Sequence, residues 1–307
     1  MSDIKLFRLA ESGISEINSE SVELEKSLQS LIEVNLETIL EVRFLASEYA
    51  TGKTHGGRID TLGIDENACP VIIEYKRALN ENVINQGLFY LDWLLDHKAE
   101  VKFLVIDKYG REEADQIDWS GTRLLCVAAD FTRYDEHAVQ QINRNIELIR
   151  YRRFGEDLLL LELVNAVTAR VPEAKPAKAG ERRANDKTVT VALVGLHAHL
   201  LDVFEALRAF LAALGDDVQE KRLTRYIAFK RLKNFVCIDV RRDKLLLYLK
   251  LNPDTVQFEP GFSRDVRNSG LYWTGKTELT IRNEIDLDKA PGDNVGTEGA
   301  LKKLGAI

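Results

Sequence analysis

Long hydrophobic runs are missing from this chain of 307 residues, and its first residues do not read as a secretory leader. None of its apolar stretches approaches the roughly 20 residues that a membrane-spanning helix needs, so the sequence predicts no membrane partner. The opening residues, MSDIKLFRLAESG, do not have the basic and then apolar segments of a signal peptide. We therefore expect a cytoplasmic protein.

Cysteine is scarce, and several familiar catalytic motifs are absent. The three cysteines form no CxxC pair, and we expect buried free thiols in place of a disulfide framework or a cysteine metal site. The chain contains no GxSxG, no HExxH and no Rossmann glycine pattern. These absences argue against a serine hydrolase, a zinc protease of the HExxH type and a dinucleotide-dependent enzyme.

Positive charge is also in deficit, but it is unevenly distributed. The formal net charge is −7, which argues against a protein that coats nucleic acid along its whole surface. Residues 220–250 nevertheless contain far more Lys and Arg than Asp and Glu, interleaved with aromatic residues. Such a mixture suits phosphate attraction and base stacking, with Lys230 and Arg231 as candidates. Strand alternation that buries the aromatics and exposes the charges explains the same pattern, and both interpretations stay open.

Two domains are predicted, joined by a linker. The segment 171–187 contains prolines, small residues and mixed charges without apolar periodicity, as linkers do. It separates a domain at 1–170 from a smaller domain at 188–307. The smaller one is predicted to be α+β with an antiparallel sheet: a single helix over 190–214, ending at Gly215, is followed by strands.

The first domain is predicted to be a mixed α/β sheet with helices on its faces. Apolar spacing of three and four predicts a helix over 24–39, and another over about 80–97. Strands are expected at 42–50, 57–65, 69–77, 101–107 and 123–129. A helix is expected at 135–146, and two closing strands lie on either side of the turn at Gly155. The segments 57–65 and 69–77 are separated by a short turn and should form an antiparallel hairpin.

That hairpin carries the most informative residues. Side chains alternate along a strand, so Glu74 and Lys76 share one face while Tyr75 points to the other, and Asp60 on the neighbouring strand can join the first two. Burying such charges is costly unless they pair or bind a metal. The two carboxylates and the Tyr75 carbonyl are hard oxygen ligands suited to Mg²⁺ or Mn²⁺. Lys76 would orient the attacking water or stabilise charge on a phosphodiester.

The next predicted helix contains NQGLFYLDW, which places Gln86 and Tyr90 on one face. With this helix, residues 20–165 resemble the RecB-like branch of the PD-(D/E)xK nucleases, which have a restriction-endonuclease-like fold. The resemblance implies a metal-dependent DNA nuclease, with Gln86 and Tyr90 beside the active centre. It also implies an acidic residue from the first helix, for which Glu25 and Glu33 are candidates. Nucleases of this fold often pair, which allows a homodimer.

Further nucleic-acid contacts are predicted near the motif, at Lys53, His55, Arg58 and Arg77. The segment 52–58 serves equally well as a flexible hairpin loop. Two other functions stay open for the whole chain. It can be a catalytically silent module that keeps the nuclease fold to bind nucleic acid or protein, or it can be a soluble accessory protein.

Overall fold

The structure is a computed structural model that divides the chain into two compact units, Met1–Arg170 and Val171–Ile307. It describes residues 4–11, 13–20, 25–52, 56–76, 83–167, 188–215, 217–269 and 275–289. The expected linker at 171–187 lies outside these residues. Within the described residues, no helix is long and apolar enough to cross a membrane.

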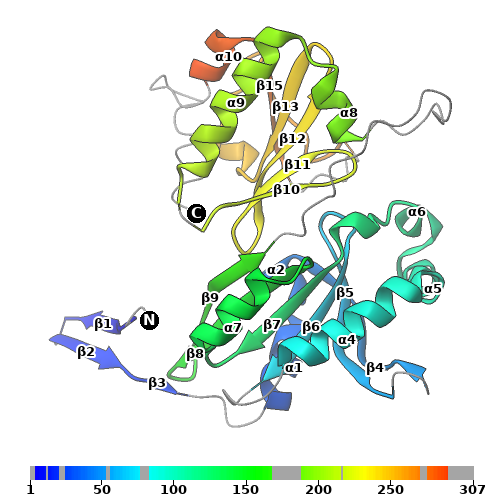
Figure 1. Cartoon of the computed structure of the whole chain (residues 1–307). Coiled ribbons are helices and arrows are strands. Elements are labelled where there is room, and N and C mark those ends of the chain that lie inside the picture. The colour runs from blue at the N-terminus through cyan, green and yellow to red at the C-terminus, as the bar shows by residue number, and fades with distance from the viewer. Residues whose placement is uncertain are drawn as a thin grey trace. The chain divides into compact units, whose positions relative to one another are not determined.

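A seven-stranded mixed sheet forms the centre of the first unit (Figure 1). Its order is β3-β8-β7-β6-β5-β4, with β9 paired to β8. The strands are β3 (Ser19–Glu20), β4 (Val42–Ala50), β5 (Arg58–Asp65), β6 (Pro70–Lys76), β7 (Arg123–Ala128), β8 (Asn145–Phe154) and β9 (Leu158–Val167). Strands β4, β5 and β6 are antiparallel, whereas β6, β7 and β8 run parallel. A separate hairpin is formed by β1 (Leu6–Ala10) and β2 (Gly13–Ile17).

Helices flank both faces of this sheet. The helices of this unit are α1 (Glu25–Val34), α2 (Leu36–Leu40), α4 (Val83–Asp96), α5 (Lys98–Tyr109), α6 (Arg111–Ala114), η1 (Trp119–Gly121) and α7 (Arg133–Gln140). Helix α4 lies across β5, β6 and β7 (Figure 1) and packs on the face that contains Ile72. The neighbouring residue Ile73 is paired with Thr61, whose side chain therefore points to the other face. There Thr61 contacts Glu33 of α1.

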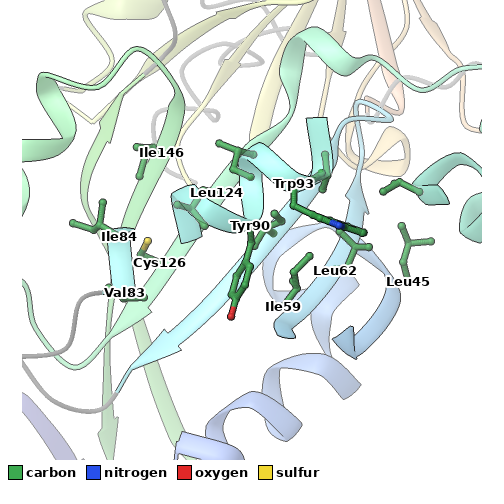
Figure 2. Close-up of a cluster of buried hydrophobic side chains, with 14 of the residues drawn as sticks. Leu45, Ile59, Leu62, Val83, Ile84, Tyr90, Trp93, Leu124, Cys126 and Ile146 are labelled. Atoms are coloured by element: carbon green, nitrogen blue, oxygen red, sulfur yellow. The ribbon is translucent and has the colours of Figure 1, made fainter. Parts of the chain in front are cut away.

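The core between α4 and the sheet is apolar and continuous (Figure 2). It is built from α4 residues such as Leu91, Trp93 and Leu94 and from strand residues such as Leu62, Ile72, Leu124 and Cys126. All residues of β7 are buried, as expected for a central parallel strand. Gly87 brings α4 close to this strand, because a Cβ there would lie 2.5 Å from a methyl group of Leu124.

A buried ionic cluster links the end of β5 to β7 and β8. The Arg123 guanidinium donates to Asp65 at 3.0 Å and to both carboxylate oxygens of Glu147 at 2.9 and 3.0 Å. All three side chains are buried. The second oxygen of Asp65 accepts from the backbone N–H groups of Asn67 and Cys69, which fixes the turn between β5 and β6. The cluster therefore connects that turn to β7 and β8.

The second unit packs helices on one face of a six-stranded antiparallel sheet of order β10-β11-β12-β13-β15-β14. Its strands are β10 (Gln219–Arg222), β11 (Ile227–Lys230), β12 (Asn234–Arg241), β13 (Lys244–Leu249), β14 (Ser263–Asp265) and β15 (Thr277–Ile281). Its helices are α8 (Val189–Val194), α9 (Ala198–Ala212), η2 (Pro253–Thr255) and α10 (Glu284–Lys289). Leu207 and Leu211 of α9 are fully buried in its core.

The fold class predicted from the sequence is confirmed: a mixed sheet flanked by helices, and a smaller α+β unit with an antiparallel sheet. The three cysteines are free and buried, as expected.

Several predicted elements are wrong. Residues 101–107 belong to helix α5, in which Val101 and Val105, four apart, face the core while Phe103 is exposed. The single helix over 190–214 is two helices, because α8 ends at Val194, with Gly195 as its C-cap, and α9 begins after His197, which has an extended backbone. The helix predicted to reach residue 146 ends at Gln140.

Candidate active site

The central sheet divides where β5 and β6 carry the predicted motif. Pairing between these strands runs from Ile64–Pro70 to Thr61–Ile73. Beyond that point, residues 58 and 59 pair with β4, while residues 74–76 pair with β7. We call residues 58–60 and 74–76 the strand fork. It lies at the carboxyl end of β6, and the carboxyl ends of parallel strands are where α/β sheets usually bind ligands.

Asp60 and Glu74 face each other across the fork. The backbone N–H of Asp60 donates to Glu74 Oε1 at 3.1 Å. The backbone N–H of Tyr75 donates to Asp60 Oδ2 at 3.0 Å. Each carboxylate thus holds a backbone group of the opposite strand where the strands separate. The structure brings together the two acidic residues that the sequence singled out, and it confirms the predicted hairpin.

Glu74 is in an unusual electrostatic position. Its side chain is 0% exposed, and its Oε2 has no hydrogen-bond partner among the described residues. Burial, and next the charge of Asp60, raise the pKa of the Glu74 carboxyl to about 9. The backbone hydrogen bond from Asp60 and the charge of Lys76 act in the opposite direction. A buried carboxyl oxygen without a partner costs free energy, and a bound cation or proton would offset that cost.

Lys76 and Tyr75 lie where strand alternation predicts. Lys76 is half-buried at the end of β6 and close enough to Glu74 to lower the pKa of its carboxyl. The Tyr75 side chain is buried beside Thr61, whose hydroxyl lies 3.4 Å from the Tyr75 hydroxyl. Burial also raises the pKa of the Tyr75 phenol. Its backbone carbonyl remains the predicted third oxygen ligand.

Gln86 and Tyr90 come together on α4, and Tyr90 reaches the strand that carries Asp60. The Gln86 amide donates to the Tyr90 hydroxyl at 3.3 Å. That hydroxyl also accepts from the backbone N–H of Arg58 at 3.2 Å. Figure 2 shows the Tyr90 ring among the apolar side chains, with its oxygen directed away from them. A Cβ at Gly57 would lie 2.5 Å from this oxygen, so glycine permits the contact. Tyr90 therefore positions the start of β5.

The first helix contributes one acidic side chain near the fork. Glu33 Oε1 accepts from the Thr61 hydroxyl at 2.6 Å and from the Gln29 amide at 3.1 Å. The same Gln29 amide donates to the Asp60 carbonyl at 2.8 Å. Glu33 is thus linked through the Gln29 amide to the backbone of β5. Glu25 begins α1, but its side chain lies outside the described residues.

Sequence reasoning missed one acidic residue, Glu48 of β4. It lies between the pairs Ser47–Thr61 and Tyr49–Ile59, which places it opposite Asp60 in the sheet. Its φ of 50° is in the left-handed region, which non-glycine residues rarely adopt within a strand. No local signal in the segment 42–50 distinguishes this glutamate, because its position depends on the pairing of β4 with β5.

Of the four nucleic-acid contacts predicted in the first unit, one lies among the described residues. Arg58 is exposed at the fork, whereas Lys53, His55 and Arg77 lie outside the described residues.

In the second unit, Lys230 is only 2% exposed, so its ammonium is not presented to solvent. Arg231 donates to Asp217 at 3.1 Å and to the Leu214 carbonyl at 3.0 Å. A nucleic-acid role for either residue stays a prediction.

The donor set at the fork suits a hard divalent cation. Two carboxylates and a carbonyl oxygen match the preference of Mg²⁺ for oxygen ligands with several retained waters. Among the described residues, no group of three or more His, Cys, Asp or Glu side chains is arranged to hold a metal ion. A metal at the fork would therefore depend on Asp60, Glu74, backbone oxygen and water.

Sequence comparison finds a family match in the second unit and a relative along most of the chain. Residues 192–290 match a family model described as a domain of unknown function, DUF5655. An uncharacterized protein of Haemophilus influenzae is 27% identical over 293 residues, covering 91% of this chain and 94% of that protein.

Two solved structures resemble part of the chain. A repair endonuclease from Pyrococcus abyssi has 19% identity and a TM-score of 0.28, covering 45% of this chain and half (50%) of that one. A structure described as an EndoMS–dsDNA2 complex has the same identity and TM-score, covering 48% of this chain and 64% of that one.

Proposed function

We propose that the first unit is a restriction-endonuclease-like, metal-dependent nuclease that hydrolyses phosphodiester bonds of DNA. The observation that carries the proposal is the strand fork, where the carboxylates of Asp60 and Glu74 meet and Glu74 Oε2 has no hydrogen-bond partner among the described residues. Keeping the fully buried Glu74 beside the partly buried Asp60 and Lys76 costs stability. We expect the binding of a cation and a phosphodiester to offset that cost.

Each residue has a distinct role in this proposal. Asp60, Glu74 and the Tyr75 carbonyl would hold Mg²⁺ or Mn²⁺. The cation, when bound, supplies Lewis-acid stabilisation of charge on the phosphoryl group. Because the pKa of the Glu74 carboxyl is about 9 without metal, Glu74 must lose a proton when it becomes a ligand. Lys76 would orient the attacking water and stabilise negative charge in the transition state.

The test is cleavage of linear, circular, single-stranded and branched DNA with Mg²⁺, with Mn²⁺ and with EDTA. Asp60→Ala and Lys76→Ala should each abolish metal-dependent cleavage. Asp92→Ala is the matched control, because Asp92 is an exposed acid on α4. Activity that survives in both motif variants, or that persists in EDTA, would refute the proposal.

A catalytically silent module is the second candidate. It is favoured by one observation, that no group of three acidic, histidine or cysteine side chains in the described part of the chain is arranged to hold a metal. DNA binding without cleavage of any substrate would select this candidate. Homodimer formation stays a prediction of the resemblance alone, and sedimentation of the full chain with and without DNA would test it.

A further inference from the structure

The Glu48 carboxylate lies between two cations at the strand fork. Its Oε1 is 3.2 Å from Lys26 Nζ, and its Oε2 is 3.4 Å from Arg58 Nε. Lys26 belongs to α1, Glu48 to β4 and Arg58 to β5, so three separate elements meet at one carboxylate. The side chains of Lys26 and Arg58 are each 69% exposed. Both cations can therefore turn towards a ligand in solution.

This cluster is next to the candidate catalytic residues. Arg58 precedes Asp60 by two positions on β5, which separates their Cα atoms by roughly 7 Å in an extended strand. Glu48 lies across from Asp60 on β4, between two paired positions. A nucleic-acid backbone whose phosphodiester lay at Asp60 would bring a neighbouring phosphate within reach of these cations.

The backbone of Glu48 also indicates a functional constraint. Its left-handed φ of 50° is uncommon for a glutamate, and such conformations persist only where the surroundings compensate for them. The ion pairs with Lys26 and Arg58 place the Glu48 carboxylate beside the fork.

We propose that Lys26 and Arg58 form a subsite for a phosphate of the DNA backbone, and that the Glu48 carboxylate takes the place of this phosphate in the free protein. The inference rests on the proposed function, because it assumes that DNA is the ligand of the fork. Exposed ion pairs contribute little net stability, so a phosphate can displace the carboxylate readily. Arginine and lysine both bind phosphate through charge-assisted hydrogen bonds.

The experiment measures binding of the full chain to labelled duplex and single-stranded oligonucleotides by fluorescence anisotropy. EDTA is present throughout, so that cleavage does not contribute. Lys26→Gln and Arg58→Gln should each weaken binding about twofold to fivefold. Each should also reduce the slope of log affinity against log salt by about one. Glu48→Gln should instead tighten binding, because it frees both cations for phosphate.

A second variant separates this effect from misfolding. Glu48→Gly removes the carboxylate and also suits the left-handed backbone, so it should fold normally and bind DNA more tightly than wild type. The matched controls are Lys102→Gln and Asp115→Asn, which remove an exposed ion pair of 2.7 Å on α5 and the segment after α6. Neither control should change the affinity.

The possible outcomes distinguish the two proposals. If wild type binds neither oligonucleotide at low salt, DNA is not the ligand and the proposed function fails together with this subsite. If wild type binds DNA but both Glu48 variants weaken binding or leave it unchanged, the subsite is overturned while the proposed function stands. Opposite changes on removing the acid and the cations, together with no change in the Lys102→Gln and Asp115→Asn controls, are expected when Glu48 competes with phosphate.

Discussion

Replacing Glu74 by glutamine should stabilise the metal-free protein at neutral pH. The pKa of its carboxyl is about 9 in the folded chain, against an ordinary value of 4.5. Between these two values the unfolded chain is ionised and the folded chain is protonated, so folding takes up a proton. The carboxyl therefore contributes full stability below pH 4.5, and this contribution is lost as pH rises to about 9.

The size of the effect follows from the difference between pH and the unfolded pKa. One pH unit corresponds to about 1.4 kcal/mol, so the proton uptake costs wild type about 1 kcal/mol at pH 5 and about 3 kcal/mol at pH 7. Glutamine has the same shape and keeps an acceptor for the Asp60 N–H, but it does not titrate. The stability gain of Glu74→Gln should therefore grow by about 2–3 kcal/mol between pH 5 and pH 7.

Urea unfolding in EDTA measures this pH-dependent gain in stability. Tryptophan fluorescence is the signal, since Trp93 is buried in the core beside β6. Any pH-independent cost of introducing the amide cancels when the two pH values are compared. A stability difference that does not change with pH would refute the raised pKa. The same experiment with Mg²⁺ should stabilise wild type by RT ln(1 + [Mg²⁺]/Kd), about 2.7 kcal/mol at one hundred times Kd, and should stabilise Glu74→Gln less.

Two further substitutions test the supports of the site. Tyr90→Phe removes the acceptor of the Arg58 N–H. We expect the free energy of unfolding in urea to fall by about 1–3 kcal/mol, together with reduced cleavage. Unchanged stability and activity would contradict a positioning role. Arg123→Met leaves the carboxylates of Asp65 and Glu147 buried without their guanidinium partner. Thermal unfolding should show a loss of about 3–5 kcal/mol at neutral pH, and a loss below about 1 kcal/mol would show that the acids find other compensation.

Helices and strands with a clear spacing of apolar residues agree with the prediction. Errors arose where that spacing fits both a helix and a strand. The segment 101–107 is apolar and rich in β-branched residues, so periodicity alone cannot separate a strand from a helix. Only its packing shows that Val101 and Val105 face the core as successive turns of α5. The break at Gly195 was missed for a similar reason, because apolar spacing continues on both sides of it.

For the candidate site, the sequence by itself determined which side chains share a strand face. Alternation places Glu74 and Lys76 together, and the short turn between the two strands brings Asp60 opposite Glu74. These relations depend on residues that are near one another in the chain.

Only the tertiary structure decided where the sheet divides, how Tyr90 holds the start of β5, and that Glu48 lies between Lys26 and Arg58. Each of these contacts joins separate elements, so each is set by how helices and strands pack and in which register they pair. A one-residue change of register would move every side chain of β4 to the opposite face without altering its local sequence pattern. For this reason the position of Glu48 could not be predicted from its neighbours in the chain.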